Sequence, residues 1–298
     1  MQWKRYKIAP EKFRSLSRSD NLRAGLHLFF RFAGLAIPLI GIFLVTTEQP
    51  VWCFVFLVIY GVQLRFLGWA GYGHELYHEK VFTSKRFNRV LFVLFSAINY
   101  KNFGFFDVFH PIHHVNTLQT GNDLEGYASK HPKPKSFIQR FAGCTFNLPR
   151  LLTDVKILIL NACGSIHTEP GYLQTLSQTQ INKIIFGARL TLILNVSLLI
   201  TAIMTFGVAL GICVVYSHYI FTQLNDNLSA MQHSDGIWDA NDFKLNTNTV
   251  RVSAISRFLY ANMNYHREHH MYPSIPYYNL AKLHDELVSQ HPELTIDN

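Results

Sequence analysis

A chain of 298 residues is long enough for one large domain or two small ones, and its composition is unlike that of a typical soluble protein. Hydrophobic residues make up 49% and charged residues only 15%, whereas soluble domains carry about 25% charged residues. The formal net charge is +8. The four cysteines show no CxxC spacing, which argues against a disulfide framework or a zinc ribbon. These features predict a protein embedded in lipid.

The N-terminal arm, residues 1–23, is strongly basic. It contains seven lysines and arginines against Glu11 and Asp20. It has no short apolar core, so we expect no signal peptide. Positive charge beside membrane segments is typical of the cytoplasmic side, which predicts a cytoplasmic arm. Because membrane orientation explains the charge, no nucleic-acid partner is expected.

Four apolar segments are predicted to cross a bilayer, which takes about 20 residues of helix. The first two lie at about 24–46 and 51–70. The other two come from the uncharged stretch Leu190–Asn225, which we expect to turn near Phe206 and Gly207. Since the links are short, each pair is predicted to form a transmembrane hairpin, at about 24–70 and 184–225.

Two hairpins leave the arm and the segments 71–183 and 226–298 on one side of the membrane. The predicted fold class is therefore an all-α integral membrane protein. Its single domain, 1–298, would contain four transmembrane helices as two hairpins and a cytoplasmic helical cap. We expect a multi-pass protein of the bacterial inner membrane or the endoplasmic reticulum, with both termini and the active site cytoplasmic.

Three histidine clusters stand out from the rest of the sequence. They are His74 and His78; His110, His113 and His114; and His266, His269 and His270. Residues three and four apart share one face of a helix, so each cluster can present its imidazoles in one direction. The predicted topology brings all three clusters to the same membrane face. Eight histidines exceed the four ligands of a tetrahedral zinc site and suit two metals.

The pattern HxxxH, HxxHH and HxxHH resembles that of the membrane fatty acid desaturase and hydroxylase superfamily. The stretches HPIHHVNTLQTGNDLEG and NYHREHHMYPSIPYYNLAKLH resemble its second and third histidine boxes with the regions that follow. The resemblance covers roughly residues 50–285. It implies a mushroom-like architecture, two non-haem irons in the cap and an O2-dependent reaction on an aliphatic chain.

The resemblance also implies which residues hold the metals. The eight box ligands would be His74, His78, His110, His113, His114, His266, His269 and His270. A ninth histidine is implied between the last span and the third box, and we choose His233. The rival, His218, lies within the fourth predicted span and is expected to hydrogen-bond to a neighbouring helix instead.

Other polar residues are weaker candidates for the site. Ser229 stands where the acyl-CoA branch has an asparagine that holds a metal-bound water, and Asn227 is a weak substitute. Asp123, Glu125 and Glu268 either fix imidazole orientation or are ordinary surface charges. His27 is expected near a membrane end. The remaining histidines, His131, His167, His284 and His291, are expected to face solvent.

The expected function is oxidation of a lipid or acyl substrate. Iron fits because attack on an unactivated C–H bond needs a redox metal, and zinc has no redox chemistry. A desaturase that introduces a double bond into a fatty acyl chain is the first hypothesis. The alternative is a hydroxylase, ketolase or alkane-type monooxygenase. A metal transporter is disfavoured, because it would place ionisable residues inside the spans.

Two further features bear on the branch of the superfamily and on the electron source. The HxxxH spacing of the first box is less like the acyl-CoA branch and more like acyl-lipid desaturases and several hydroxylases. The sequence contains no HPGG motif and no cysteine cluster. We therefore expect a separate electron donor, a ferredoxin or a b-type cytochrome with its reductase.

Overall fold

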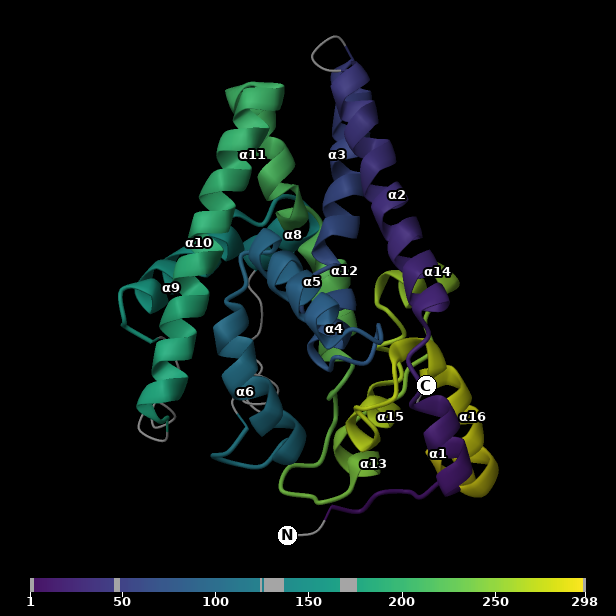
Figure 1. Cartoon of the computed structure of the whole chain (residues 1–298). Helices are drawn as coiled ribbons and strands as arrows, with labels where there is room; N and C mark the ends of the chain where they lie inside the picture. The colour runs from purple at the N-terminus through teal and green to yellow at the C-terminus, as the bar shows by residue number, and fades with distance from the viewer. Residues whose placement is uncertain (1–2, 46–48, 124, 126–136, 167–175, 297–298) are drawn as a thin grey trace.

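The computed structural model describes residues 3–45, 49–123, 125, 137–166 and 176–296. Within these residues the secondary structure is helical, with isolated β-bridges and no strand. Two helical hairpins extend to one end of the molecule, and shorter helices form a layer at the other end (Figure 1). We call this layer of shorter helices the cap. The predicted all-helical class is confirmed.

The first hairpin consists of α2 (Asn21–Val45) and α3 (Pro50–Arg65). Asp20 caps α2, because its Oδ1 accepts hydrogen bonds from the backbone N–H groups of Leu22 and Arg23 at 3.0 and 3.1 Å. Pro50 begins α3 at its first turn, where a backbone N–H would have no acceptor within the helix, so its missing N–H costs no hydrogen bond. The two helices pack along their length.

The second hairpin consists of α10 (Gln178–Phe206) and α11 (Val208–Tyr216), continued by η2 (Ser217–Tyr219). A capping box between Ser177 and Gln180 starts α10, so the helix begins earlier than the predicted boundary at 184. Gly207 ends it with a φ of +78°, a conformation that favours glycine. The turn expected near Phe206 and Gly207 is confirmed.

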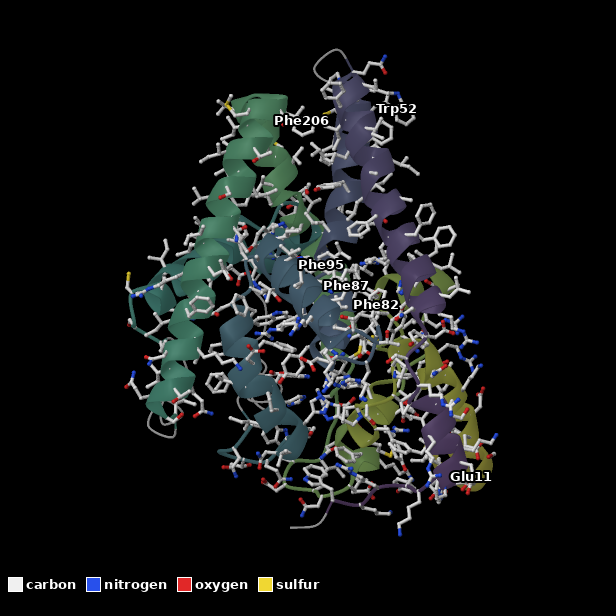
Figure 2. The ribbon with its side chains drawn as sticks, in the orientation of Figure 1. Glu11, Trp52, Phe82, Phe87, Phe95 and Phe206 are labelled. Carbon is white, nitrogen blue, oxygen red and sulfur yellow. The ribbon has the colours of Figure 1, made fainter. Side chains whose placement is uncertain are left out.

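Only some of these helices are long enough to cross a bilayer on their own. By length and composition α2 and α10 could do so, while α3 and the α11–η2 segment are apolar but shorter. Large apolar side chains, among them Phe29, Phe43, Trp52 and Met204, are exposed on the hairpins. Trp52 and Phe206 lie near the hairpin tips, far from Glu11 at the opposite end of the molecule (Figure 2). This apolar surface needs a lipid environment or a partner to cover it.

The cap is built from short helices that precede or follow the hairpins in the chain. The three histidine clusters lie in or next to α4 (Tyr72–Tyr77), α6 (Phe103–Val115) and α15 (His266–Met271). His233 lies between α12 (Thr222–Ala230) and α13 (Phe243–Asn246) in the chain. The supporting helices are α1 (Pro10–Leu16), α5 (Lys85–Ile98), α8 (Phe137–Cys144), α9 (Leu148–Ala162), α14 (Ala254–Leu259), η3 (Tyr277–Asn279), α16 (Leu280–Gln290) and η4 (Pro292–Leu294). A shared apolar core, including Tyr72, Leu76, Phe92, Phe106 and Met271, joins α4, α5, α6 and α15.

Helix α6 is fixed against α10 by a very close backbone approach. A Cβ added at Gly104 would lie 2.2 Å from the carbonyl oxygen of Lys183. Asn102 caps α6 by accepting from the N–H of Gly104 at 3.1 Å, and its Nδ2 donates to the carbonyl of Ile184 at 3.0 Å. The second histidine cluster is therefore positioned by the base of the longest helix.

This contact predicts a strong effect of Gly104→Ala. The added methyl group must displace backbone, and such overpacking costs about 1–3 kcal/mol of unfolding free energy. We expect a lower thermal unfolding midpoint in detergent and lower metal content, because α6 carries three clustered histidines.

The matched control is Gly25→Ala in α2, where an added Cβ meets nothing within 4 Å. Replacing a helical glycine by alanine there should stabilise by about 0.5–1 kcal/mol. Equal unfolding midpoints for the two variants would contradict the proposed packing role of Gly104.

Candidate metal centre

The structure brings all nine sequence-predicted histidines together in the cap. They come from α4 with its C-cap residue His78, from α6, from the turn after α12, and from α15. Their ring nitrogens form two groups. The first is His74, His78, His110, His114 and His269, and the second is His113, His233, His266 and His270. Within each group the candidate ligand atoms all lie within 4.8 Å of one another.

The helix repeat explains how α6 and α15 serve both groups. Residues i and i+4 differ by only about 40° around a helix axis, whereas i+3 lies about 60° away in the other direction. The i,i+4 pair His110 and His114 therefore joins the first group, and His113 turns to the second. On α15 the assignment is reversed, with His266 and His270 in the second group and His269 in the first.

The spacing between ring nitrogens matches that of ligands around a metal ion. Nε2 of His110 lies 3.2 Å from Nε2 of His78 and 3.0 Å from Nε2 of His114. In the second group, Nε2 of His266 lies 3.0 Å from Nε2 of both His233 and His270. Nitrogens about 2.1 Å from a metal are about 3.0 Å apart at right angles and about 3.4 Å apart in a tetrahedron.

The hydrogen-bond partners of the Nδ1 atoms, which face away from the groups, show which ring nitrogen carries the hydrogen. His233 Nδ1 lies 2.8 Å from the carbonyl oxygen of Asn246, which can only accept, so Nδ1 carries hydrogen. Thr117 donates its hydroxyl hydrogen to the His113 carbonyl at 2.8 Å, and therefore accepts from His270 Nδ1 at 3.0 Å. The neutral rings of His233 and His270 thus present Nε2 lone pairs to His266.

This arrangement fits a cation better than it fits hydrogen bonds among the rings. Nε2 of His266 could carry one hydrogen, which cannot serve two neighbours at once. Facing lone pairs in a buried site repel one another unless a positive charge lies between them. The donor set therefore fits a metal in each group, and the groups adjoin where His114 and His270 stack with ring centroids 4.4 Å apart.

Carboxylates orient several of the rings from outside. Asp123 lies 3.0 Å from His113 Nδ1, and Glu125 lies 3.2 Å from His110 Nδ1, so both are placed as expected for residues that fix imidazole orientation. Asp123 is further held by the N–H of Leu118 at 2.8 Å.

Sequence reasoning missed Glu75, which is buried between two rings. Its Oε1 lies 3.3 Å from His74 Nδ1 and 3.2 Å from His269 Nδ1. It thereby links the first and third clusters. Its position within the first box was visible in the sequence, but the neighbour His269 is supplied only by the tertiary fold.

The electrostatic surroundings keep the rings ready to bind metal. Burial lowers the pKa of His74 to about 4 and that of His233 to about 3. Burial likewise lowers the pKa values of His78, His110, His114, His266 and His270 well below the ordinary value. These imidazoles are therefore neutral at pH 7, and neutral imidazole is the form that binds metals.

Two groups respond differently because a close partner outweighs the effect of burial. Burial alone would lower the pKa of His113, but the Asp123 carboxylate outweighs burial and raises it. Burial alone would raise the pKa of Glu75, but the rings of His269 and His74 hold it below its usual range. Both carboxylates strengthen the basicity of the rings that they contact.

Several weaker candidates lie elsewhere. Asn227 is exposed and accepts from Gln223, so it does not join the histidines. Glu268 is buried, but its oxygens contact His284 Nδ1 at 2.8 Å and Thr249 Oγ1 at 2.5 Å. The expectation that His284 faces solvent is wrong, because it is buried against Glu268 and the residues around α16.

The remaining histidines lie outside the two groups. His218 is buried, and its Nδ1 contacts the carbonyl of Val215 within its own segment at 3.1 Å rather than a neighbouring helix. His27 pairs with the hydroxyl of Tyr277, and His291 packs edge-on against Tyr6. His131 and His167 lie outside the described residues.

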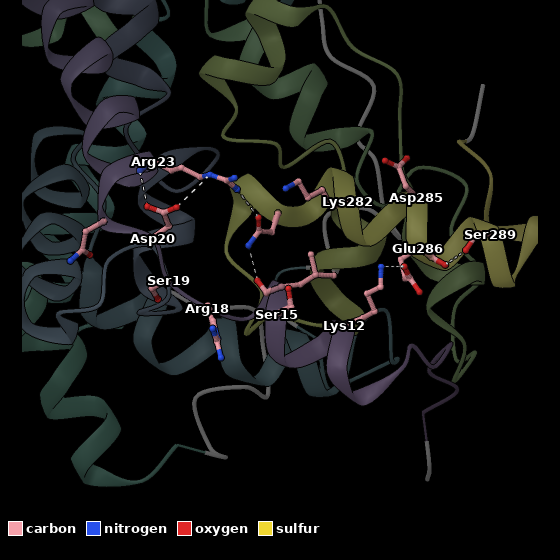
Figure 3. Close-up of a pocket in the computed structure, with 13 residues that line it drawn as sticks. Lys12, Ser15, Arg18, Ser19, Asp20, Arg23, Lys282, Asp285, Glu286 and Ser289 are labelled. Atoms are coloured by element: carbon pink, nitrogen blue, oxygen red, sulfur yellow. Dashed lines mark hydrogen bonds and ion pairs between the residues drawn. The ribbon is translucent and has the colours of Figure 1, made fainter.

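A cavity of about 930 Å³ lies away from the histidines, between α1, α16 and the start of α2 (Figure 3). Its lining is mostly polar and contains no clustered histidine. The candidate metal centre is a separate, packed group of rings.

Comparison with known proteins agrees with this site. A family model described as fatty acid desaturase matches residues 50–296, which includes all nine clustered histidines. The chain belongs to the fatty acid desaturase family. It is accordingly a fatty acyl oxidoreductase of the desaturase and hydroxylase superfamily, and its apolar helices agree with membrane association. The comparison with curated proteins found no match.

The choice of His233 over His218 can be tested directly. His233→Ala should lower bound metal by about one ion per chain, because His233 belongs to the group of four. His218→Ala should keep the metal, since its ring lies outside both groups. Metal content by elemental analysis after gel filtration decides between them, and metal loss only in His218→Ala would overturn the choice.

Proposed function

We propose that this protein is an O2-dependent, di-iron oxidoreductase that introduces a double bond into a fatty acyl chain. The observation that supports the proposal most is the pair of buried, all-histidine groups in a member of this family. One iron would be held by the group that contains His74, and the other by the group that contains His233. When bound, the irons would supply the redox chemistry needed to use O2 on an unactivated C–H bond.

The protein's own residues would hold the metals, orient the rings and exclude water. Asp123, Glu125 and Glu75 fix rings from outside, which leaves Nε2 atoms directed inward. Two hydrogens leave adjacent carbons of the acyl chain. They combine with O2, two electrons and two protons to give two waters, so a donor must supply one electron pair in each cycle.

A hydroxylase, ketolase or alkane-type monooxygenase is the second candidate. The HxxxH spacing of His74 and His78 is compatible with both candidates, because acyl-lipid desaturases and several hydroxylases share it. In hydroxylation one oxygen atom enters the substrate and the other leaves as water, with the same demand for two electrons. The histidine groups suit both outcomes, so the product decides.

The electron donor is proposed to be a separate protein, a ferredoxin or a b-type cytochrome with its reductase. The net charge of +8 would attract an acidic donor to the cap. Such steering weakens as salt shortens the screening length to about 8 Å at physiological ionic strength. Part of the basic charge lies in the N-terminal arm, where it also suits lipid headgroups.

The function is tested by iron content and by product analysis. The purified protein should hold about two irons per chain, and with donor, reductase and O2 it should convert an acyl substrate. A product lighter by two hydrogens identifies desaturation, and one heavier by an oxygen atom identifies hydroxylation. Donor affinity should fall as salt rises.

His114→Ala and His270→Ala, one from each group, should abolish turnover while the protein remains membrane-inserted. His291→Ala is the control, because that ring lies outside both groups. Full activity in either group variant would disprove the assignment of metal ligands.

Four membrane spans with a cytoplasmic cap are the proposed topology. The 16 residues of α3 extend about 24 Å, less than the hydrocarbon thickness of about 30 Å, so this span would rely on its longer partner α2 and on local thinning. Both hairpins return to the cap, which leaves the clustered histidines on one membrane face.

The topology predicts where reporter fusions will be found. Fusions before Met1 and after Asn298 should both report the cytoplasm, and an insertion next to Gln49 should report the opposite side. If the two terminal reporters are found on opposite sides of the membrane, the number of spans is odd and the proposed topology is wrong.

A further inference from the structure

A charged cavity of about 460 Å³ lies where the hairpins meet the cap. Its lining includes Arg65 at the end of α3, Lys101, Arg150 on α9, Asp226 on α12 and Trp69. These residues come from four separate parts of the chain. Since none of them belongs to the two histidine groups, the cavity is a separate feature.

Arg65 is the least satisfied cation in this cavity. Its side chain is only 7% exposed, and its Nη2 lies 3.5 Å from Asp226 Oδ1. Its Nη1 is buried and has no hydrogen-bond partner among the residues that the structure describes. A buried guanidinium N–H group without an acceptor costs free energy, so an acceptor brought by a ligand would be favoured there.

The charges around the cavity do not balance. Three cations, Arg65, Lys101 and Arg150, face two carboxylates, Asp154 and Asp226. Asp154 contacts Lys101 at 2.9 Å and Arg150 at 3.4 Å, and Asp226 contacts Arg65 at 3.5 Å and Arg150 at 3.9 Å. One net positive charge remains, which one anionic group would neutralise.

A partly apolar pocket of about 190 Å³ adjoins the charged cavity, and the two share Trp69 and Lys101. Its other lining residues are the apolar Tyr100, Phe105, Ile157 and Leu158 and the polar Asn102, Asp154 and Asn161. A ligand with an anionic head and an aliphatic chain therefore matches both halves.

Aromatic rings connect this pair of pockets to the metal centre. Trp69 packs against Phe106 with ring centroids 4.7 Å apart, and Phe106 stacks on His110 at 4.2 Å. A chain seated beside Trp69 thus lies against the aromatic wall of the first histidine group.

We propose that Arg65 and its cavity bind the anionic headgroup, a carboxylate or a phosphate, of a single-chain acyl lipid whose chain enters the apolar pocket. This inference rests on the proposed function and adds that the substrate is charged, not a neutral hydrocarbon. The planar guanidinium suits two parallel hydrogen bonds to an oxyanion. The larger groove in Figure 3 is a weaker site, because two of its four cations, Lys12 and Arg23, are exposed and already paired.

The test measures binding in nonionic detergent with three labelled probes: hexadecanoate, its methyl ester and a hexadecanoyl lysophosphatidate. Arg65→Gln should lower the affinity for the anionic probes by about tenfold or more, as expected when a charge-assisted hydrogen bond is lost. Ester binding should stay within about twofold. Lys282→Ala removes the same charge from the outer groove and is the control.

A second variant guards against misfolding of the first. Asp226→Asn removes the carboxylate that competes for Arg65, so it should tighten binding of the anionic probes. Tighter binding of hexadecanoate identifies a carboxylate as the headgroup, and tighter binding of the lysolipid identifies a phosphate. Equal losses for ester and anions in Arg65→Gln, or no gain in Asp226→Asn, would overturn the proposal.

Binding and turnover separate this inference from the proposed function. Arg65-dependent binding without any oxidised product would leave the headgroup site intact and disprove the oxidase. If ester and acid are oxidised at equal kcat/KM, and the iron content of Arg65→Gln is unchanged, the headgroup site is disproved and the proposed oxidase stands.

Discussion

The structure depends on nine imidazole rings that meet in a buried space with their lone pairs directed inward. Nε2 atoms of different rings lie 3.0 to 3.3 Å apart, a separation that suits ligands of a common ion. Neutral nitrogens gain nothing by facing one another, and burying them without partners costs free energy. The surrounding cap therefore has to supply enough packing energy to hold them in place when no metal is bound.

The support for these rings is arranged in layers. The apolar core around Phe92 and Phe106 fixes the helices, and the glycine contact at Gly104 fixes α6 against α10. Outside the rings, Asp123 and Glu75 set orientation and charge. Because α6 and α15 each contribute to both groups, a shift in either helix would disturb both sites together.

The arrangement of charge separates the candidate metal centre from the proposed headgroup site. Carboxylates and carbonyls surround the histidines, where they favour a cation at the centre. At the base of the hairpins the balance is reversed, and Arg65 with its neighbours favours an anion. Trp69 and Phe106 lie between the two, so an acyl chain held by its head would extend along an aromatic wall toward His110.

Local patterns in the sequence were enough to predict the helical class, the turn at Gly207 and the grouping of the eight box histidines, because hydropathy and the helix repeat act over a few residues. They could not predict that His113 and His269 belong to different groups from their neighbours, nor that Glu75 contacts His269. His284, expected at the surface, is buried against Glu268, and Arg65 at the end of α3 lines a cavity with residues from three other parts of the chain. Each of these depends on which distant segments pack together, and that is decided only when the apolar core forms and brings them into contact.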